Sequence, residues 1–243
     1  MPKHFISRTV WFISLVSLFT DMAGEMLYPV MPVYLKTVGY SIVFIGVLEG
    51  CTEAVAGLGK SYFGRWSDAV NKRLPFVQLG YLLSALSKPM LAVSTQWWWI
   101  FTSRFIDRTG KGMRTAPRDA MLNAESTESN KASVFGFHRM MDTFGAVLGP
   151  LIALLFLYFY PGNYKALFLL AFIPGILAVL TTLLLRERKS TVIKKAVPAF
   201  HETFTYWKQS PILYKKLITA LILFAVINSS DVFLLLKMKE AGI

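Results

Sequence analysis

The chain has 243 residues, of which 54% are hydrophobic and only 16% are charged. A soluble domain usually carries about a quarter charged residues, so the composition argues against one. The apolar residues also gather in blocks. Residues 166–185 contain no charge, and about twenty such residues let a helix cross the hydrocarbon core of a bilayer. These features indicate a membrane protein, and the single cysteine, Cys51, excludes a disulfide framework or a cysteine-based zinc cluster.

Apolar segments predict an all-α membrane protein with about seven transmembrane helices. In chain order the first three cover residues 10–35, 42–67 and 74–93. The fourth begins at residue 97 and ends between residues 109 and 117, and the last three cover residues 134–158, 165–185 and 217–236. Pro29 and Pro32 should kink or break the first of these helices. The first segment is also too long and too acidic for a signal peptide.

Lysine and arginine are distributed unevenly between the two sides of these spans. One side holds most of them, at residues 3–8, 72–73, 111–131 and 186–216, whereas the other has Lys36, Lys165 and two lysines near the chain end. Cytoplasmic loops carry this excess, so we expect a cytoplasmic amino terminus. The net charge of +12 is then explained by membrane topology and gives no support for a nucleic-acid partner.

The spacing of the spans divides the chain into three parts. Residues 1–189 form an amino-terminal six-helix bundle, residues 190–212 a basic cytoplasmic linker, and residues 213–243 the first helix of an incomplete second bundle. This is the layout of a transporter built from two six-helix halves. We therefore expect the chain to lack a carboxy-terminal half and to be inactive in transport alone.

Charged residues inside the spans are the candidate proton and substrate site, because charges at membrane depth are costly and mark transport pathways. Helical spacing places them in pairs on shared faces. The pairs are Asp21 with Glu25, Glu49 with Glu53, Arg104 with Arg108, and His138 with Asp142. At the membrane depth of Arg104 and Arg108, the nearest expected acids are Asp21 and Glu25 on the first span. Asp107 lies on the same helix as the two arginines. Two hypotheses stay open: these charges only hold the bundle together, or one carboxylate exchanges a proton as substrate arrives.

The stretch from residue 103 to 122 contains two glycines among five cationic side chains. It resembles a phosphate-binding loop, but its glycines match no strand-to-helix phosphate motif. Its cations recur at helical spacing over an arc of about 120°. We therefore expect one helix that leaves the membrane partway along, with glycines that allow close packing.

Residues 64–73, GRWSDAVNKR, resemble the cytoplasmic loop signature of the major facilitator superfamily, G-x-L-A-D-R-x-G-R-K. The matching positions are Gly64, Asp68, Lys72 and Arg73. Asn71 stands where the family has glycine, a mild change because asparagine tolerates a left-handed backbone. Ala69 replaces a basic residue. The resemblance implies a cytoplasmic gate in which Asp68 and Lys72 take part, with Asp119 as a further contact.

Two other motifs carry the same resemblance. Gly145, Gly149 and Pro150 are similar to the G-x-x-x-G-P element of antiporter branches, and glycines four apart let helices approach closely. Arg104 corresponds to the arginine of the family's fourth-helix motif, although Arg108 stands where the family has glycine. The chain as a whole resembles a bacterial subgroup of the superfamily.

The resemblance implies a bundle of 3+3 inverted repeats in a bacterial inner membrane. It also implies a secondary active transporter, a proton-coupled exporter of a small molecule that works by alternating access. A symporter or uniporter for a polar or charged metabolite remains an alternative, and a membrane-embedded phosphotransferase a remote one. Seven spans with a cytoplasmic amino terminus argue against a receptor. We expect no enzyme activity, no cofactor and no metal; the expected partners are the lipid bilayer, the substrate and protons.

Overall fold

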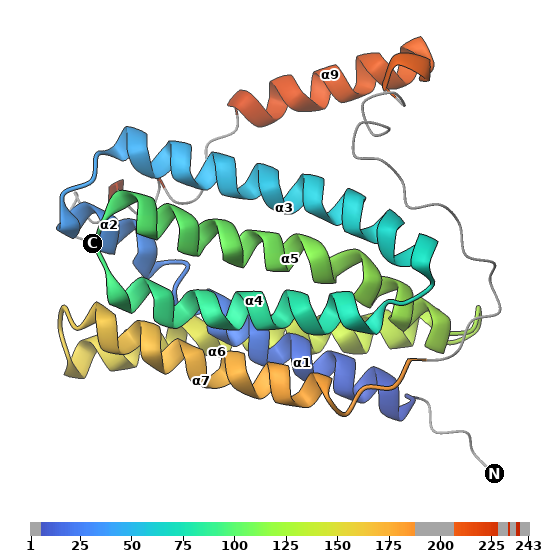
Figure 1. Cartoon of the computed structure of the whole chain (residues 1–243), viewed down its shortest axis with the longest axis horizontal. Helices are drawn as coiled ribbons and strands as arrows, with labels where there is room; N and C mark the ends of the chain where they lie inside the picture. Colours follow the sequence, from blue (N-terminus) through green and yellow to red (C-terminus); the bar gives the residue numbers. More distant parts are fainter. Residues whose placement is uncertain (1–5, 188–206, 228–232, 234–236, 239–243) are drawn as a thin grey trace.

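The computed structural model describes residues 6–187, 207–227, 233 and 237–238, and this part of the chain is helical without strands (Figure 1). The predicted linker and the end of the predicted seventh span lie largely outside these residues. The helices are α1 Arg8–Glu25, α2 Val30–Val38, α3 Ile42–Val70, α4 Leu74–Val93, α5 Trp97–Glu125, α6 Lys131–Phe159, α7 Tyr164–Thr182 and α9 Ile212–Ile227.

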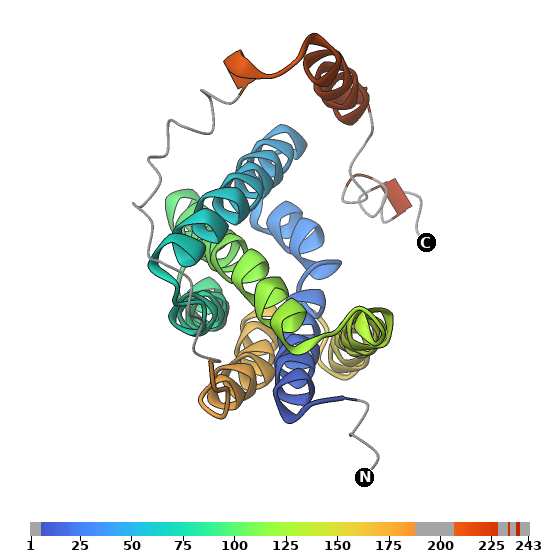
Figure 2. The same cartoon turned by 90° about the vertical axis from the view of Figure 1, so that its right-hand side faces the viewer.

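Five segments in the described part of the chain are long and apolar enough to cross a membrane. They are the α1–α2 segment, α3, α4, α6 and α7. The remaining long helix of the bundle, α5, lies between α3 and α4 (Figure 1) but carries too many charges to meet the same criterion. The bundle thus has six spans, and α9 lies outside it in both views (Figures 1 and 2).

Some helices end where the sequence predicts a boundary, and others extend beyond the predicted boundary. The first span breaks between Glu25 and Val30, as the two prolines predict. α3 continues beyond the predicted residue 67 and ends where Asn71 adopts the left-handed conformation, with φ 52°. α5 continues through Pro117 to residue 125, which agrees with the prediction of one helix through residues 103–122 that extends beyond the predicted membrane span. A proline removes a single backbone hydrogen bond, and close packing on α3 and α4 holds the helix on both sides.

The helices pack in a pattern that repeats within the bundle. α1 packs on α6 and α7, α4 packs on α5 and α7, and α3 packs on α5. If α1 is exchanged with α5, α3 with α6 and α4 with α7, the same set of packed pairs results. Spans three apart run in opposite directions, so the pattern is that of 3+3 inverted repeats.

Two apolar clusters fill the bundle, one towards each end. One contains Met26, Leu91, Ile100 and their neighbours, and the other contains Val16, Tyr81 and theirs. The charged residues Asp21 and Glu25 of α1, Lys88 of α4 and residues 104–114 of α5 fall between the positions that belong to these two clusters. The structure therefore has a polar layer at mid-depth, with packed apolar layers on either side.

Candidate transport site

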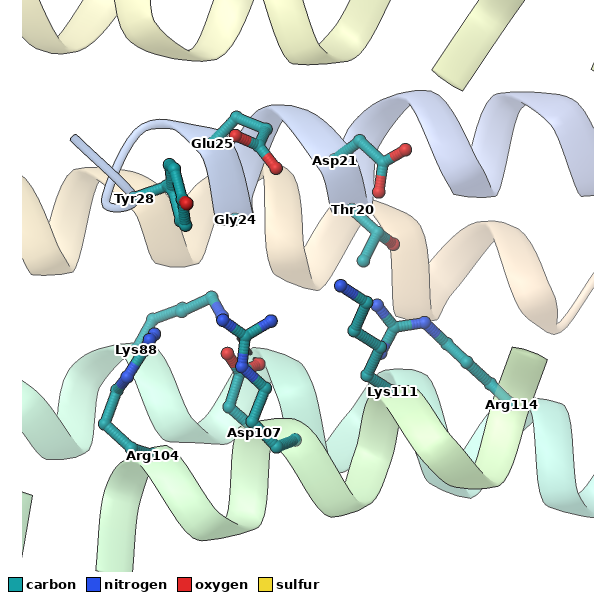
Figure 3. A pocket seen from close by; sticks show the side chains of 11 residues that line it. Thr20, Asp21, Gly24, Glu25, Tyr28, Lys88, Arg104, Asp107, Lys111 and Arg114 are labelled. Atoms are coloured by element: carbon teal, nitrogen blue, oxygen red, sulfur yellow. Dashed lines mark hydrogen bonds and ion pairs between the residues drawn. The ribbon is translucent and has the colours of Figure 1, made fainter. Parts of the chain in front are cut away.

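The polar layer contains a pocket between α1 and the α4–α5 pair (Figure 3). Its cavity volume is about 60 Å³, and a cavity needs only about 10–15 Å³ by this measure to hold a water molecule. Its lining comes from α1 and the turn after it, from α4 and from α5: Thr20, Asp21, Gly24, Glu25, Tyr28, Lys88, Arg104, Asp107, Arg108, Lys111 and Arg114.

Helical periodicity explains why these side chains converge. On α5 the lining residues recur every three or four positions from Arg104 to Arg114, which places them on one face. On α1, Asp21 and Glu25 are one turn apart. They lie just before the break in the first span and point across the pocket towards α4 and α5 (Figure 3).

Two of the three arginines of the pocket, Arg104 and Arg108, are paired with acids from α3. Arg104 forms a salt bridge with Glu49, and Arg108 lies 2.9 Å from Glu53 and 3.6 Å from Glu49. The arginine side chains are buried, with 7% and 9% of their surface exposed. These contacts connect α3 to α5 along their shared face.

This pairing corrects the expectation that the two arginines meet Asp21 and Glu25. No lysine or arginine nitrogen of the described residues lies within 4.0 Å of either α1 carboxylate. The physical reason is the packing, because α3 lies against α5 whereas α1 faces α5 across the pocket with little contact. The α1 acids share the pocket with the arginines without forming ion pairs.

A second ion pair in the pocket involves a residue that the sequence analysis missed. Lys88 of α4 donates a hydrogen bond to Asp107 of α5, with 2.8 Å between the two atoms. Both side chains are largely buried. Lys88 is the one charged residue in the span 74–93, and an isolated charge inside an apolar span was the signal that could have identified it.

Two further cations of the pocket have no acidic partner. Neither Lys111 nor Arg114 has a carboxylate oxygen within 4.0 Å among the described residues. Arg114 is buried, donates a hydrogen bond to the Ser84 hydroxyl and lies 4.7 Å from the centre of the Tyr81 ring. Its direct contacts are therefore with neutral groups, and the nearest unpaired acid in the pocket is Asp21 across the cavity.

His138 and Asp142 were predicted to belong to the same cavity, but they do not line this pocket. They form a separate buried cluster on α6, where the His138 Nε2 and Asp142 Oδ2 atoms are 3.6 Å apart. Both ring nitrogens of His138 and the Oδ1 atom of Asp142 are buried without a hydrogen-bond partner. They belong to α6, which packs on α1 and makes little contact with α5.

The sequence comparisons identify the family. A family model described as Major Facilitator Superfamily matches residues 13–242 of the chain. The chain belongs to the major facilitator superfamily.

Relatives within the superfamily include proteins with and without an assigned role. The chain is 32% identical over 236 residues to an uncharacterized MFS-type transporter, MJ1317, of Methanocaldococcus jannaschii. The matched region covers 97% of this chain and 58% of that protein. It is 28% identical over 122 residues to the quinolone resistance protein NorA of Staphylococcus aureus, covering 50% of this chain and 31% of NorA. The chain thus spans between about a third and three fifths of these relatives.

Solved structures of superfamily transporters share the fold. A POT family transporter in complex with 5-aminolevulinic acid superposes with a TM-score of 0.69 at 17% identity, covering 92% of this chain and 48% of that one. The human organic anion transporter MFSD10 superposes with a TM-score of 0.65, also at 17% identity, covering 79% and 50% of the two chains. At these identities the likeness concerns the fold alone.

The superfamily loop signature falls on a helix end in this structure. Gly64 and Asp68 lie within α3 rather than in a loop, and the Arg73 guanidinium lies 3.0 Å from Asp68. Asp119, which was expected to contact this signature, pairs instead with its neighbour Arg118 at 3.0 Å. Lys72 contributes a backbone hydrogen bond that closes the end of α3.

A residue outside the signature holds this end of the bundle together. The Glu187 carboxylate, just beyond α7, accepts hydrogen bonds from the backbone N–H groups of Arg73 and Leu74 at the start of α4. An acid at this place satisfies free N–H groups and interacts favourably with the helix dipole. Glu187 could not be singled out from the sequence, because nothing in the sequence shows which helix start its carboxylate reaches.

The glycines of the antiporter-like element lie where α6 meets α1. A Cβ atom at Gly145 would lie 3.1 Å from the Leu18 Cα, and one at Gly149 would lie 2.6 Å from the Met22 carbonyl oxygen. The two backbones are therefore in direct contact at these positions. Pro150 follows within α6 without ending the helix.

Proposed function

We propose that this chain is part of a secondary active transporter that exports a small solute in exchange for protons. The observation that carries the proposal is the pair Asp21 and Glu25. Their carboxylates line a mid-membrane pocket and have no counter-ion of their own within 4.0 Å in the described residues.

Such carboxylates suit proton coupling for an electrostatic reason. A carboxylate at membrane depth is stabilised either by a proton or by a nearby cation. Asp21 and Glu25 can accept either, because no protein cation occupies them. Arg104 and Arg108 are engaged with α3, so in this proposal they fix the architecture of the site and do not exchange with protons.

The family motifs support the rest of the proposal. In this proposal, the contact between Asp68 and Arg73 and the backbone hydrogen bonds that Glu187 accepts are parts of a gate at the basic end of the bundle, on the side expected to be cytoplasmic. The α1–α6 contact at Gly145 and Gly149 fits the antiporter element. We place the protein in a bacterial inner membrane and propose that a second six-helix half supplies the opposite wall of the pathway.

The test is proton flux in proteoliposomes that contain this chain together with a second half. A fluorescent quinolone, chosen from the role of NorA, serves as the first probe, with a pH gradient as the driving force. We expect Asp21→Asn and Glu25→Gln to abolish gradient-driven accumulation of the quinolone. Glu128→Gln, at an exposed loop position, is the control.

Two results would contradict parts of the proposal. If both substitutions left gradient-driven transport unchanged, the carboxylates would not be the coupling groups. If protons and solute moved in the same direction, the protein would be a symporter. The 243-residue chain reconstituted alone should show no flux, since the transport pathway then lacks the wall that the second half supplies.

A further inference from the structure

We propose that the pocket binds a small zwitterion, whose ammonium group contacts Asp21 and Glu25 and whose anionic group contacts Lys111 and Arg114. This inference rests on the proposed function, because it assigns a substrate class to the same pocket. It goes further by predicting which charges the solute carries and how they are oriented.

The unpaired charges of the pocket are sorted by helix. Of the eight charged residues that line the pocket, four already form ion pairs: Lys88 with Asp107, and Arg104 and Arg108 with acids of α3. The other four have no ion-pair partner among the described residues. They are two acids, both on α1, and two cations, both on α5.

The four unpaired side chains lie in two pairs that face each other. Asp21 and Glu25 are one helical turn apart, and so are Lys111 and Arg114. The two pairs lie on opposite walls, with the acids on α1 facing the cations on α5 (Figure 3). Each wall therefore presents two charges of one sign to the same small space.

A solute that pairs with only one wall leaves unpaired charges on the other. The pocket lies between two packed apolar clusters, where an unpaired charge is expensive. A simple amine would leave Lys111 and Arg114 without an anion, and a simple carboxylate would leave the two acids without a cation. A solute with both groups satisfies both walls, so the site discriminates against solutes with one charge.

The arrangement also explains how solute and protons would exclude each other. An ammonium group needs ionised carboxylates on α1, and a proton on those carboxylates removes the charge it would bind. Solute binding at one face of the membrane and proton binding at the other then alternate on the same two side chains. Exchange follows from competition for Asp21 and Glu25 without a second proton site.

The experiment measures ligand binding to the purified protein in detergent through the shift in its melting temperature. The probes are 5-aminopentanoate, pentylamine and pentanoate, which share a carbon chain and differ only in their charged ends. At saturation we expect 5-aminopentanoate to raise the melting temperature by about 2–4 °C, and by more than pentylamine and pentanoate together. A series from glycine to 6-aminohexanoate should show an optimal length.

Paired variants identify which wall binds which group. Asp21→Asn with Glu25→Gln should weaken the binding of 5-aminopentanoate by about tenfold or more and leave the weak binding of pentanoate intact. Lys111→Gln with Arg114→Gln should weaken the binding of 5-aminopentanoate by a similar factor and leave the weak binding of pentylamine intact. Lys60→Gln, on an exposed position of α3, should change nothing. The melting temperature of each variant without ligand reports whether it is folded.

Equal binding of pentanoate and 5-aminopentanoate would overturn the inference in favour of an anion site, and no binding of any probe would overturn it as well. The two proposals fail separately. Proton-coupled movement of a quinolone that depends on Asp21, without zwitterion binding, would leave the proposed function standing and remove only the substrate class.

Discussion

Lys88 shows how one side chain fixes two helices relative to each other. Its ammonium group is buried, and its ion pair with Asp107 joins α4 to α5 beside the pocket. Removing one member of a buried pair leaves the other charge uncompensated, which costs more than the pair itself contributes. The energetic role of Lys88 therefore depends on Asp107 being present.

We expect Lys88→Met to destabilise the protein by about 3–5 kcal/mol, because it leaves the Asp107 carboxylate buried without a partner. The double variant Lys88→Met, Asp107→Asn should recover most of this loss. Melting temperatures of the three proteins in the same detergent give the comparison, and Lys60→Met is the matched exposed lysine. Additive losses in the double variant would show that the two residues do not act as a pair.

At the level of helices, the bundle is assembled through backbone contacts at glycines. Gly80 of α4 and Gly110 of α5 lie so close that a Cβ atom at Gly80 would be 2.7 Å from the Gly110 carbonyl oxygen. Gly112 of α5 makes a similar approach to α3. The glycines that first resembled a phosphate loop thus let α5 pack tightly on both neighbours, and this closeness brings its charged face to the acids of α3 and to Lys88.

The same principle gives a prediction on α6. Gly145→Ala should destabilise the protein by about 1–3 kcal/mol, because the added methyl group would overlap the backbone of α1 near Leu18. Gly136→Ala on the same helix is the control. A Cβ atom there meets nothing within 4 Å, so the higher helix propensity of alanine should raise stability slightly. Equal melting temperatures for the two variants would contradict the proposed contact.

Helix positions could be predicted from the sequence more fully than the contacts between helices. The span 74–93 matches α4 at both ends, and the start at residue 97 matches α5, because apolar runs and loop residues mark these places locally. The partners of Arg104 could not be predicted. Acids at similar depth occur on α1 and α3, and only the packing of α3 on α5 decides between Asp21 and Glu49.

For the molecule as a whole, almost all close packing between helices joins one three-span unit to the other. α7 packs on α4 and α1, and beyond its end Glu187 reaches the start of α4. This carboxylate therefore joins the last span of one repeat to the last span of the other. In the proposed gate it holds the turn that contains Arg73 in place.

We expect Glu187→Ala to expose the start of α4. Hydrogen–deuterium exchange at the Arg73 and Leu74 amides should become faster, since both lose their acceptor, and stability should fall by about 0.5–2 kcal/mol, as for the loss of a helix cap. The exposed Glu128→Ala variant should leave exchange at these amides unchanged. Unchanged exchange in Glu187→Ala would show that the contact does not persist in solution.

The position of α5 in the chain has a consequence for how the protein is made. Each charge near the centre of a helix adds about 2.5–3.5 kcal/mol to the free energy of inserting that helix from the translocon, and α5 is too polar to qualify as a span by composition. Its ion-pair partners Glu49, Glu53 and Lys88 lie on α3 and α4, which the ribosome delivers first. When α5 leaves the ribosome, the helices that carry its ion-pair partners have already been synthesised. The insertion of α5 into the bilayer therefore depends on the helices that precede it.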